Sequence, residues 1–320
     1  MIVTALTEMF GLQHPIVLGP MGGVSGGRLA AAVSNAGGLG LVGGGYGEPA
    51  WLRTELSRVK EDTRRPWGVG LITWSIERSV LDLALGYRPA AFLLSFGDPR
   101  TYAAAIKSAG CKLICQVQDV EQARMAREAG ADLIVAEGTE AGGHGGARAT
   151  LPLVPAVVDA VAPTPVVAAG GIADGRGLAA SLMLGAHGAL IGTRFYASAE
   201  ALGQDGAKKR IVAAHASETG RTCVFDIIRS YAWPPEYPGR ALRNRFMERW
   251  HGREGALKAA LETERAAYQA AAREGDFDTA VVWAGEAVDL IKSVDSAAEL
   301  VARISAEAEA QLRAGAGLAR

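Results

Sequence analysis

The sequence is poor in cysteine and contains no long uninterrupted hydrophobic run. Its 320 residues include only Cys111, Cys115 and Cys223. A structural zinc site needs about four ligands, so we expect buried, reduced thiols and no metal. No segment approaches the roughly 18 apolar residues of a membrane-spanning helix. The N-terminal residues also lack a basic stretch followed by an apolar core. We therefore expect a cytoplasmic protein that does not bind a membrane.

An excess of positive charge is also missing. The chain carries 33 lysines and arginines against 34 aspartates and glutamates, a net charge of −1. Nucleic-acid-binding proteins usually present a basic field, and no basic run interleaved with aromatics occurs here, so nucleic acid is not an expected partner. Hydrophobic residues make up 49% of the chain. The protein can therefore bury a substantial core in one large unit, or in one domain with an appendage.

What the sequence does contain is a repeated alternation of short apolar runs and helical stretches. The apolar runs are typical of buried parallel strands. Helical stretches such as residues 27–37, 120–130 and 175–186 separate them. Eight alternations predict an α/β fold of the TIM (β/α)8 barrel type; an open doubly wound sheet is the alternative, because weak strands are easily miscounted. The expected strands are residues 15–21, 39–42, 67–73, 90–96, 111–117, 132–137, 165–170 and 188–192.

The alternation stops near residue 205. We expect residues 1–205 to form the barrel, residues 206–290 to form a smaller, mostly helical substrate or lid domain, and residues 291–320 to form a helix that packs back on the barrel. The middle segment carries a proline-rich turn and a basic amphipathic stretch. We interpret that stretch as a solvated helix face.

Two glycine-rich loops follow the seventh and eighth expected strands, where barrels of this kind often bind phosphate. In the first loop, Gly170 and Gly171 allow backbone N–H groups to approach an anion. A helix that opens at residues 174–175 would point its positive end at the same place. In the second loop, Gly192 and Thr193 add a backbone donor and a hydroxyl. Together the loops predict a phosphate site; purely structural glycine turns are the alternative.

Five motifs, in this order, resemble those of the nitronate monooxygenases, formerly called 2-nitropropane dioxygenases. They read PIVLGPMGG, AGGLGLVGGG, EGTEAGGHGG, PVVAAGGIADGRG and GALIGTRF, and the likeness is dense over residues 12–200. The resemblance implies an FMN-dependent barrel enzyme with a helical substrate domain. FMN-dependent enoyl-acyl-carrier-protein reductases resemble the same series, and some relatives are NAD(P)H:quinone reductases. The motifs are therefore more specific for the superfamily than for the reaction.

The resemblance also implies where the flavin binds. Gly170, Gly171, Gly192 and Thr193 would hold the FMN phosphate, in agreement with the position of the two loops in a barrel. The other flavin contacts are expected from Pro20, Met21 and Gly22 beside the ring, from Gln116 and Glu137 at the ring edge or ribityl chain, and from Gly142 and Gly143 close to the ring.

The third expected strand departs from the family pattern. Several relatives carry an asparagine where this chain has Gly70, so a side-chain hydrogen bond to the flavin is missing. We expect water or a neighbour such as Thr73 to substitute for it, or the flavin to be held less tightly. Small substrates also need an apolar pocket. Its candidate lining residues are Trp74, Phe96, Tyr231, Trp233 and Trp283.

His144 is the candidate catalytic residue. It lies between two pairs of glycines just after the sixth expected strand, so no large side chain crowds it. In the family that it resembles, its counterpart is the catalytic base. An imidazole with a pKa near about 6.5 can remove a proton from a carbon acid, or hold an anion, at neutral pH. A histidine that only packs the loop is the alternative.

Three functions remain in competition. The resemblance implies, first, FMN-dependent oxidation of alkyl nitronates, extending to nitroalkanes, by dioxygen to a carbonyl compound and nitrite. The second is NAD(P)H-dependent reduction of an enoyl thioester or a quinone through FMN. The third is flavin binding without turnover. The expected partners are a small nitronate and dioxygen, and a homo-oligomer is left open.

Overall fold

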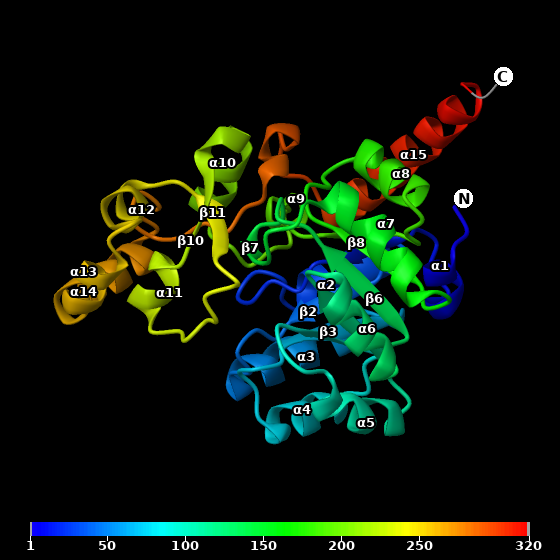
Figure 1. Cartoon of the computed structure of the whole chain (residues 1–320), viewed down its shortest axis with the longest axis horizontal. Coiled ribbons are helices and arrows are strands. Elements are labelled where there is room, and N and C mark those ends of the chain that lie inside the picture. Colours follow the sequence, from blue (N-terminus) through cyan, green and yellow to red (C-terminus); the bar gives the residue numbers. More distant parts are fainter. Residues whose placement is uncertain (1, 319–320) are drawn as a thin grey trace.

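Eight short apolar segments form a parallel sheet in the computed structural model, which describes residues 2–318. The strands are β1 (Ile16–Leu18), β2 (Gly40–Gly43), β3 (Trp67–Ile72), β4 (Ala91–Ser95), β5 (Lys112–Val117), β6 (Leu133–Glu137), β8 (Val166–Ala169) and β9 (Ala189–Ile191). They are joined in the order β1-β9-β8-β6-β5-β4-β3-β2, and a parallel bridge between Val17 and Leu39 brings β1 against β2. The sheet closes, and the predicted TIM (β/α)8 barrel is confirmed (Figure 1).

Helices on the outside of the barrel connect successive strands, and their starts follow from the sequence. Helix α6, for example, begins after Asp119, whose carboxylate accepts a hydrogen bond from the Gln122 N–H at 2.8 Å. The small buried side chain of Ala123 allows it to pack closely on the sheet. The outer helices are α2 (Gly27–Asn35), α3 (Pro49–Asp62), α4 (Arg78–Leu85), α5 (Arg100–Ser108), α6 (Val120–Glu128), α7 (Thr150–Val161), α8 (Gly175–Met183) and the short α9 (Thr193–Tyr196).

The barrel interior is a separate hydrophobic cluster that closes one end of the barrel. Strand residues such as Leu41, Leu93 and Val135 are fully buried there, as the alternation of side chains in a barrel requires. Helix α1 (Ala5–Phe10) adds Leu6 and Phe10 to the same cluster. Because α1 lies at the N-terminal ends of the strands, the opposite, C-terminal ends remain available for a binding site.

A smaller lobe follows the barrel and has its own hydrophobic cluster (Figure 1, yellow to orange). The aromatic side chains of Phe225, Phe246, Trp250 and Tyr268 are buried in it. Its helices are α11 (Val224–Arg229), α12 (Arg245–Trp250), α13 (Glu254–Ala259) and α14 (Leu261–Glu274). The flanking elements α10 (Asp205–Ala213) and η2 (Glu286–Leu290) instead add side chains to the barrel cluster. The domain boundaries at residues 205 and 290 stay a prediction.

A three-stranded antiparallel sheet connects the smaller lobe to the barrel. Strands β10 (Thr219–Thr222) and β11 (Gly239–Leu242) pair with each other, and β11 also pairs with β7 (Gly143–His144). Since β7 belongs to the loop after β6, the loop that carries His144 is part of both the barrel and the smaller lobe. The sequence pattern did not predict this sheet, because each of its strands is too short to show an alternation.

The C-terminal helix α15 (Ala297–Ala316) lies against α8 and α2. Gly175 permits the close approach, because a Cβ atom there would lie 2.3 Å from the Cβ of Glu307. Glu307 also accepts a hydrogen bond from the Gly175 N–H at 3.0 Å. None of the helices within residues 2–318 combines the length and the apolar character that crossing a membrane requires.

Candidate functional site

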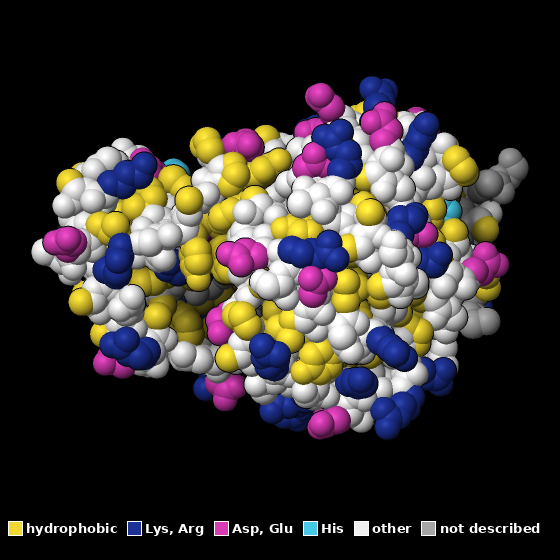
Figure 2. Space-filling view, turned by 90° about the horizontal axis from the view of Figure 1, so that it is seen from below, with side chains coloured by type: hydrophobic (Ala, Val, Ile, Leu, Met, Phe, Trp, Pro, Cys, Tyr) yellow, Lys and Arg dark blue, Asp and Glu magenta, His cyan; other side chains and the backbone are white. Residues whose placement is uncertain are grey.

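A large cavity lies where the C-terminal ends of the barrel strands meet the smaller lobe, and we refer to it as the main cavity. Figure 2 shows the molecule hollowed between these two parts, with hydrophobic side chains at the rim. Every residue predicted for the site lines this cavity. These residues are Pro20, Met21, Gly22, Gln116, Glu137, Gly142, Gly143, His144, Gly170, Gly171, Gly192 and Thr193.

The loops after β8 and β9 form an end of the main cavity that is rich in backbone donors. Gly170 and Gly171 have φ angles of +100° and +73°, which favour glycine. No hydrogen bond between described residues uses the N–H groups of Gly171, Ile172 or Thr193. The Thr193 hydroxyl accepts from the Gly285 N–H at 3.0 Å, which leaves its own hydrogen available to donate. Several donors can thus converge on one anion, as a phosphate requires.

Helix α8 begins at Gly175 after the N-cap Asp174, where the sequence predicted a helix start, but the N–H groups of its first turn are already paired. Asp174 caps this helix and accepts from the N–H groups of Arg176 at 3.0 Å and Gly177 at 3.3 Å. The remaining N–H of the first turn, that of Gly175, donates to Glu307. Two carboxylates therefore satisfy the N–H groups of this helix end, and the approach of its positive end to the phosphate stays a prediction. The donors come from the loop before α8 instead.

The missing side chain at Gly70 has a steric cause. A Cβ atom at Gly70 would lie 2.2 Å from the Cβ of Pro20, so the first loop occupies the space that a side chain would need. Thr73 does not line the main cavity. Its hydroxyl oxygen is buried without a partner among the described residues. The structure therefore does not support Thr73 as the substitute for the asparagine.

Glu137 is a buried carboxyl group with a raised pKa. Its Oε2 atom accepts hydrogen bonds from the side-chain amides of Gln116 at 2.8 Å and Gln118 at 3.1 Å. Burial raises the pKa of Glu137 to about 7, although the two amides and the charge of Arg221 oppose the shift. Near neutral pH this carboxyl can therefore either donate or accept a hydrogen bond at the wall of the main cavity.

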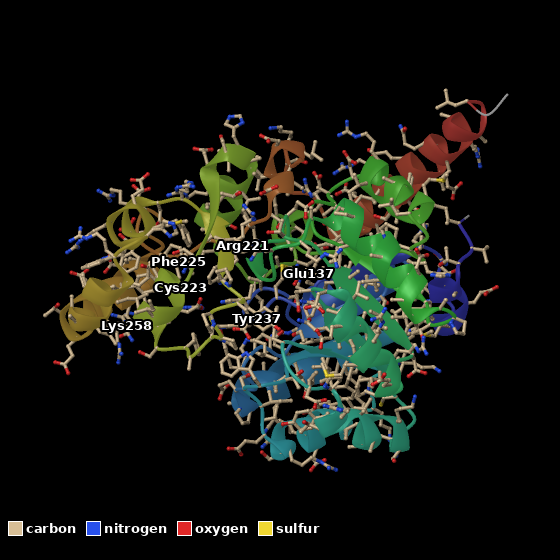
Figure 3. The ribbon with its side chains drawn as sticks, in the orientation of Figure 1. Glu137, Arg221, Cys223, Phe225, Tyr237 and Lys258 are labelled. Carbon is tan, nitrogen blue, oxygen red and sulfur yellow. The ribbon has the colours of Figure 1, made fainter. Side chains whose placement is uncertain are left out.

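Arg221 of the smaller lobe holds the loop that carries His144. Its guanidinium donates to the hydroxyl and carbonyl oxygens of Thr139 at 3.0 and 2.9 Å, and to the carbonyls of Gly145 at 3.1 Å and Pro238 at 2.6 Å. Figure 3 shows Arg221 and Glu137 near the junction between the two parts of the molecule. The smaller lobe therefore fixes the backbone on both sides of His144.

His144 is held by Asp226 of helix α11. The His144 Nε2 atom lies 2.9 Å from Asp226 Oδ2, and the two side chains are only 8% and 3% exposed. The imidazole stacks on Trp233 at a centroid distance of 3.5 Å. Burial lowers the pKa of His144 below 6.5, although Asp226 opposes the shift. The ring is therefore neutral at pH 7.

The hydrogen bond to Asp226 also determines which nitrogen of His144 can act as a base. In the neutral ring, the proton belongs on Nε2, where it is donated to the carboxylate. The lone pair is then on Nδ1, which has no hydrogen-bond partner in the part of the chain that the structure describes. His144 can thus accept a proton at Nδ1.

The sequence did not identify Asp226, Arg229 or Tyr46. Asp226 and Arg229 lie in a helix without a motif, far along the chain from His144, and nothing in their spacing indicates the pairing. Tyr46 had a usable signal, because it follows β2 directly at the C-terminal edge of the barrel. Its hydroxyl accepts from the Trp233 ring N–H at 2.8 Å. Of the predicted aromatic residues, Phe96, Trp233 and Trp283 line the main cavity, and Trp74 and Tyr231 do not.

Metal ligands are not part of this arrangement. Within residues 2–318, no group of three or more histidine, cysteine, aspartate or glutamate side chains is placed to hold a metal ion. The three cysteines are free thiols. The groups available for chemistry at the main cavity include the neutral imidazole of His144, the buried carboxyl of Glu137, the guanidinium of Arg229, backbone donors and aromatic walls.

Comparisons with known proteins place the chain in a family. The family model described as nitronate monooxygenase matches residues 3–75 and 72–307. The chain is 33% identical to a nitronate monooxygenase of Neurospora crassa over 94% of this chain and 91% of that protein. It is 38% identical to a (3aS,4S,5R,7aS)-5-hydroxy-7a-methyl-1-oxo-octahydro-1H-indene-4-carboxyl-CoA dehydrogenase of Mycobacterium tuberculosis over 77% of this chain and 68% of that protein.

A solved structure gives the same result for the fold. The structure of FabK from Thermotoga maritima matches with a TM-score of 0.89 and 33% identity, over 99% of this chain and all of that one. The family match extends through nearly the whole chain and includes each of the loops that line the main cavity. The chain belongs to the nitronate monooxygenase family, and it is a flavin-dependent oxidoreductase.

Proposed function

We propose that this protein oxidises alkyl nitronates, and the corresponding nitroalkanes, with FMN as its cofactor and dioxygen as its oxidant, giving a carbonyl compound and nitrite. The observation that carries the proposal is the pair of His144 and Asp226. It provides a neutral base at the wall of a cavity that Phe96, Trp233 and Trp283 make largely apolar. Such walls suit a small alkyl group and exclude water.

The walls of the main cavity fit FMN. The N–H groups of Gly171, Ile172 and Thr193 would hold the phosphate, since no other described group uses them. Gly22 faces Gly45, where an added Cβ atom would already lie 3.5 Å from the Gly45 Cα. A flat ring can therefore approach the main chain there without meeting side chains. When bound, FMN supplies the electron-accepting ring that the side chains of this protein lack.

The protein residues then act on the substrate. A neutral nitroalkane must lose its α-proton before it can be oxidised, and Nδ1 of His144 is placed to accept that proton. The Arg229 guanidinium, at 3.2 Å from Asp226, also lines the main cavity. Its positive charge favours an anionic substrate such as a nitronate. A nitronate arrives already deprotonated, so His144 orients it rather than deprotonating it.

An alkyl nitronate should be consumed by the flavin-loaded protein with dioxygen uptake and nitrite release, in the absence of NADH and NADPH. An oxygen electrode measures the dioxygen consumed and a nitrite assay measures the product, with free FMN at the same concentration as the control. In an anaerobic stopped-flow experiment, the nitronate should bleach the flavin absorbance. Rapid bleaching by NADH or NADPH, combined with inert nitronates, would overturn the proposal.

That contrary result would support a second candidate, an NAD(P)H-dependent reductase of an enoyl thioester or a quinone. One observation favours it: the relative that shares 38% identity is named for activity on a coenzyme A thioester. Flavin binding without turnover is a weaker candidate, because a buried carboxylate that orients a neutral imidazole has no role in simple binding.

Replacing Asp226 by Asn should lower turnover of a neutral nitroalkane and move the acid limb of its pH profile to lower pH. Asp226 raises the pKa of His144 against the effect of burial, so without its charge the pKa falls further below 6.5. The base then stays unprotonated to lower pH. The rate falls because an asparagine amide can donate to Nε2, which places the ring proton on Nδ1.

The measurement is kcat/KM against pH for the nitroalkane, with the nitronate as the internal control. The nitronate profile should change little, since no proton is removed from it. An acid limb that stays in place, or that moves to higher pH, would show that Asp226 does not act through His144.

A further inference from the structure

A second cavity lies beside the main one, and we refer to it as the side cavity. It is bounded by the C-terminal ends of β4 and β5, by helix α6 and by the segment that carries Tyr237. Figure 3 shows Tyr237 on the side of the smaller lobe that faces the barrel. Phe96 and Gln116 line both cavities. Only these two side chains are shared, so they form the partition between the two spaces.

Most of the side chains that line the side cavity are apolar. Leu94, Val117 and Ala126 contribute aliphatic groups, and Met125 contributes a flexible thioether. Cys115 adds a buried thiol, and burial raises its pKa to about 12, so it remains neutral. The cavity has a volume of about 180 Å³. An apolar cavity of roughly 150 Å³ can stay dry and take up xenon, so this space is large enough for a small apolar molecule.

The polar side chains on the wall are engaged with protein partners. Gln122 donates to Asp119 at 2.9 Å and to the Tyr237 hydroxyl at 3.1 Å, and its oxygen accepts from the Gln118 N–H at 3.0 Å. The amide of Gln116 donates to Glu137 at 2.8 Å. An ordered water needs two to four polar partners, and these groups leave few. The side cavity therefore favours an uncharged, apolar occupant over water.

The partition has an unusual backbone. Phe96 has a φ angle of +57°, in the left-handed region that bulky residues rarely adopt. Its ring is held by edge contacts with Trp233 at 4.9 Å and with Tyr237 at 5.2 Å between centroids. Strain of this kind persists where the surroundings impose it, often beside active sites. Here it places an aromatic ring beside Gln116 in the partition between the two cavities.

We propose that the side cavity is a dioxygen site, from which the oxidant enters the main cavity past Phe96 while the substrate occupies the open mouth. The proposal rests on the proposed function, because it assigns a location to the oxidant of that reaction. Dioxygen is small, uncharged and apolar, and it matches a mostly apolar cavity in which the amides of Gln116 and Gln122 already donate to protein partners. A separate site for it removes the need for two reactants to share one entrance.

Xenon provides a test that does not depend on any activity. Crystals of the wild-type holoenzyme, pressurised with xenon, should show a xenon atom between Ala126 and Leu94. Ala126→Leu should abolish xenon binding, because leucine fills the space and is compatible with a helix. The matched control is Met125→Leu, a change of similar volume that leaves the cavity nearly unaltered. Absence of xenon from the wild-type cavity would overturn the proposal, whether or not the variants fold.

The second measurement is flavin reoxidation after reduction by dithionite, which needs no nitronate. Mixing with dioxygen in a stopped-flow instrument should show reoxidation slowed several-fold in Ala126→Leu and unchanged in Met125→Leu. Equal rates in all three proteins would overturn the proposal. The proposal would also be overturned if Ala126→Leu raised the KM for longer alkyl nitronates and left flavin reoxidation unchanged. That result would assign the side cavity to the alkyl chain of the substrate. Failure of the nitronate reaction itself leaves both readouts intact, so the two proposals fail separately.

Discussion

His144→Ala should reduce turnover of a neutral nitroalkane by about 10²–10⁴-fold, the usual contribution of positioned proton transfer. The loss should be much smaller with the corresponding nitronate. The nitroalkane must give its α-proton to a base, and the Nδ1 atom of His144 is free to accept it because Nε2 is committed to Asp226. The nitronate has already lost that proton in solution. The difference between the two losses therefore measures the base function alone.

The alanine variant also leaves the buried carboxylate of Asp226 without its histidine partner, which by itself can disturb helix α11. His144→Gln is the matched control, because its side-chain amide reaches about as far as Nε2, so it can donate to Asp226 but cannot accept a proton. Both variants should bind flavin as the wild type does, since the backbone of Gly142 and Gly143 is unchanged. Steady-state assays on flavin-loaded protein give the two rates. Equal losses with both substrates would make His144 an anion holder, and no loss with either would remove it from the mechanism.

The barrel could be predicted from the sequence because its signal is local. Each strand of a closed parallel sheet is buried on both faces. Its sequence is therefore a short, nearly continuous run of apolar residues, such as that of β4 (Ala91–Ser95). Strand β7 (Gly143–His144) has two residues and no such signal. It forms only because β11 offers a partner nearly a hundred residues later. The sheet that joins the smaller lobe to the barrel could therefore not be predicted from a local sequence pattern.

The site likewise contains residues that a local sequence signal predicts and residues that only long-range packing brings together. Parallel strands bring their C-terminal ends to one rim, so residues following β1, β5, β6, β8 and β9 could be expected together in advance. No sequence signal indicated Asp226, because it reaches His144 only through the packing of a helix in the smaller lobe. The pairing of the α8 N-terminus could not be predicted for a related reason. Glu307 returns from the C-terminal helix to satisfy Gly175, a contact that no local sequence window contains.

Gly171→Asp should give a folded but colourless protein. Two unit charges about 4 Å apart repel by about 4 kcal/mol at an effective dielectric constant of about 20, which corresponds to roughly a thousandfold loss of affinity. An aspartate at Gly171 would put such a charge among the N–H groups that we assign to the FMN phosphate. The φ angle of +73° is one that Asp and Asn tolerate better than other side chains. An added Cβ atom would lie 3.3 Å from the Cβ of Glu140, close but not overlapping.

Gly171→Asn separates charge from shape, because asparagine has the same size and the same backbone preference as aspartate. It should retain far more flavin than the aspartate variant. Flavin content is measured by absorbance after purification, and the cofactor is released by denaturation and identified by mass, which should be that of FMN for the wild type. Circular dichroism shows whether both variants are folded. If the aspartate variant keeps wild-type occupancy, the phosphate lies elsewhere. If both variants lose the flavin equally, space at Gly171 matters and its charge environment does not.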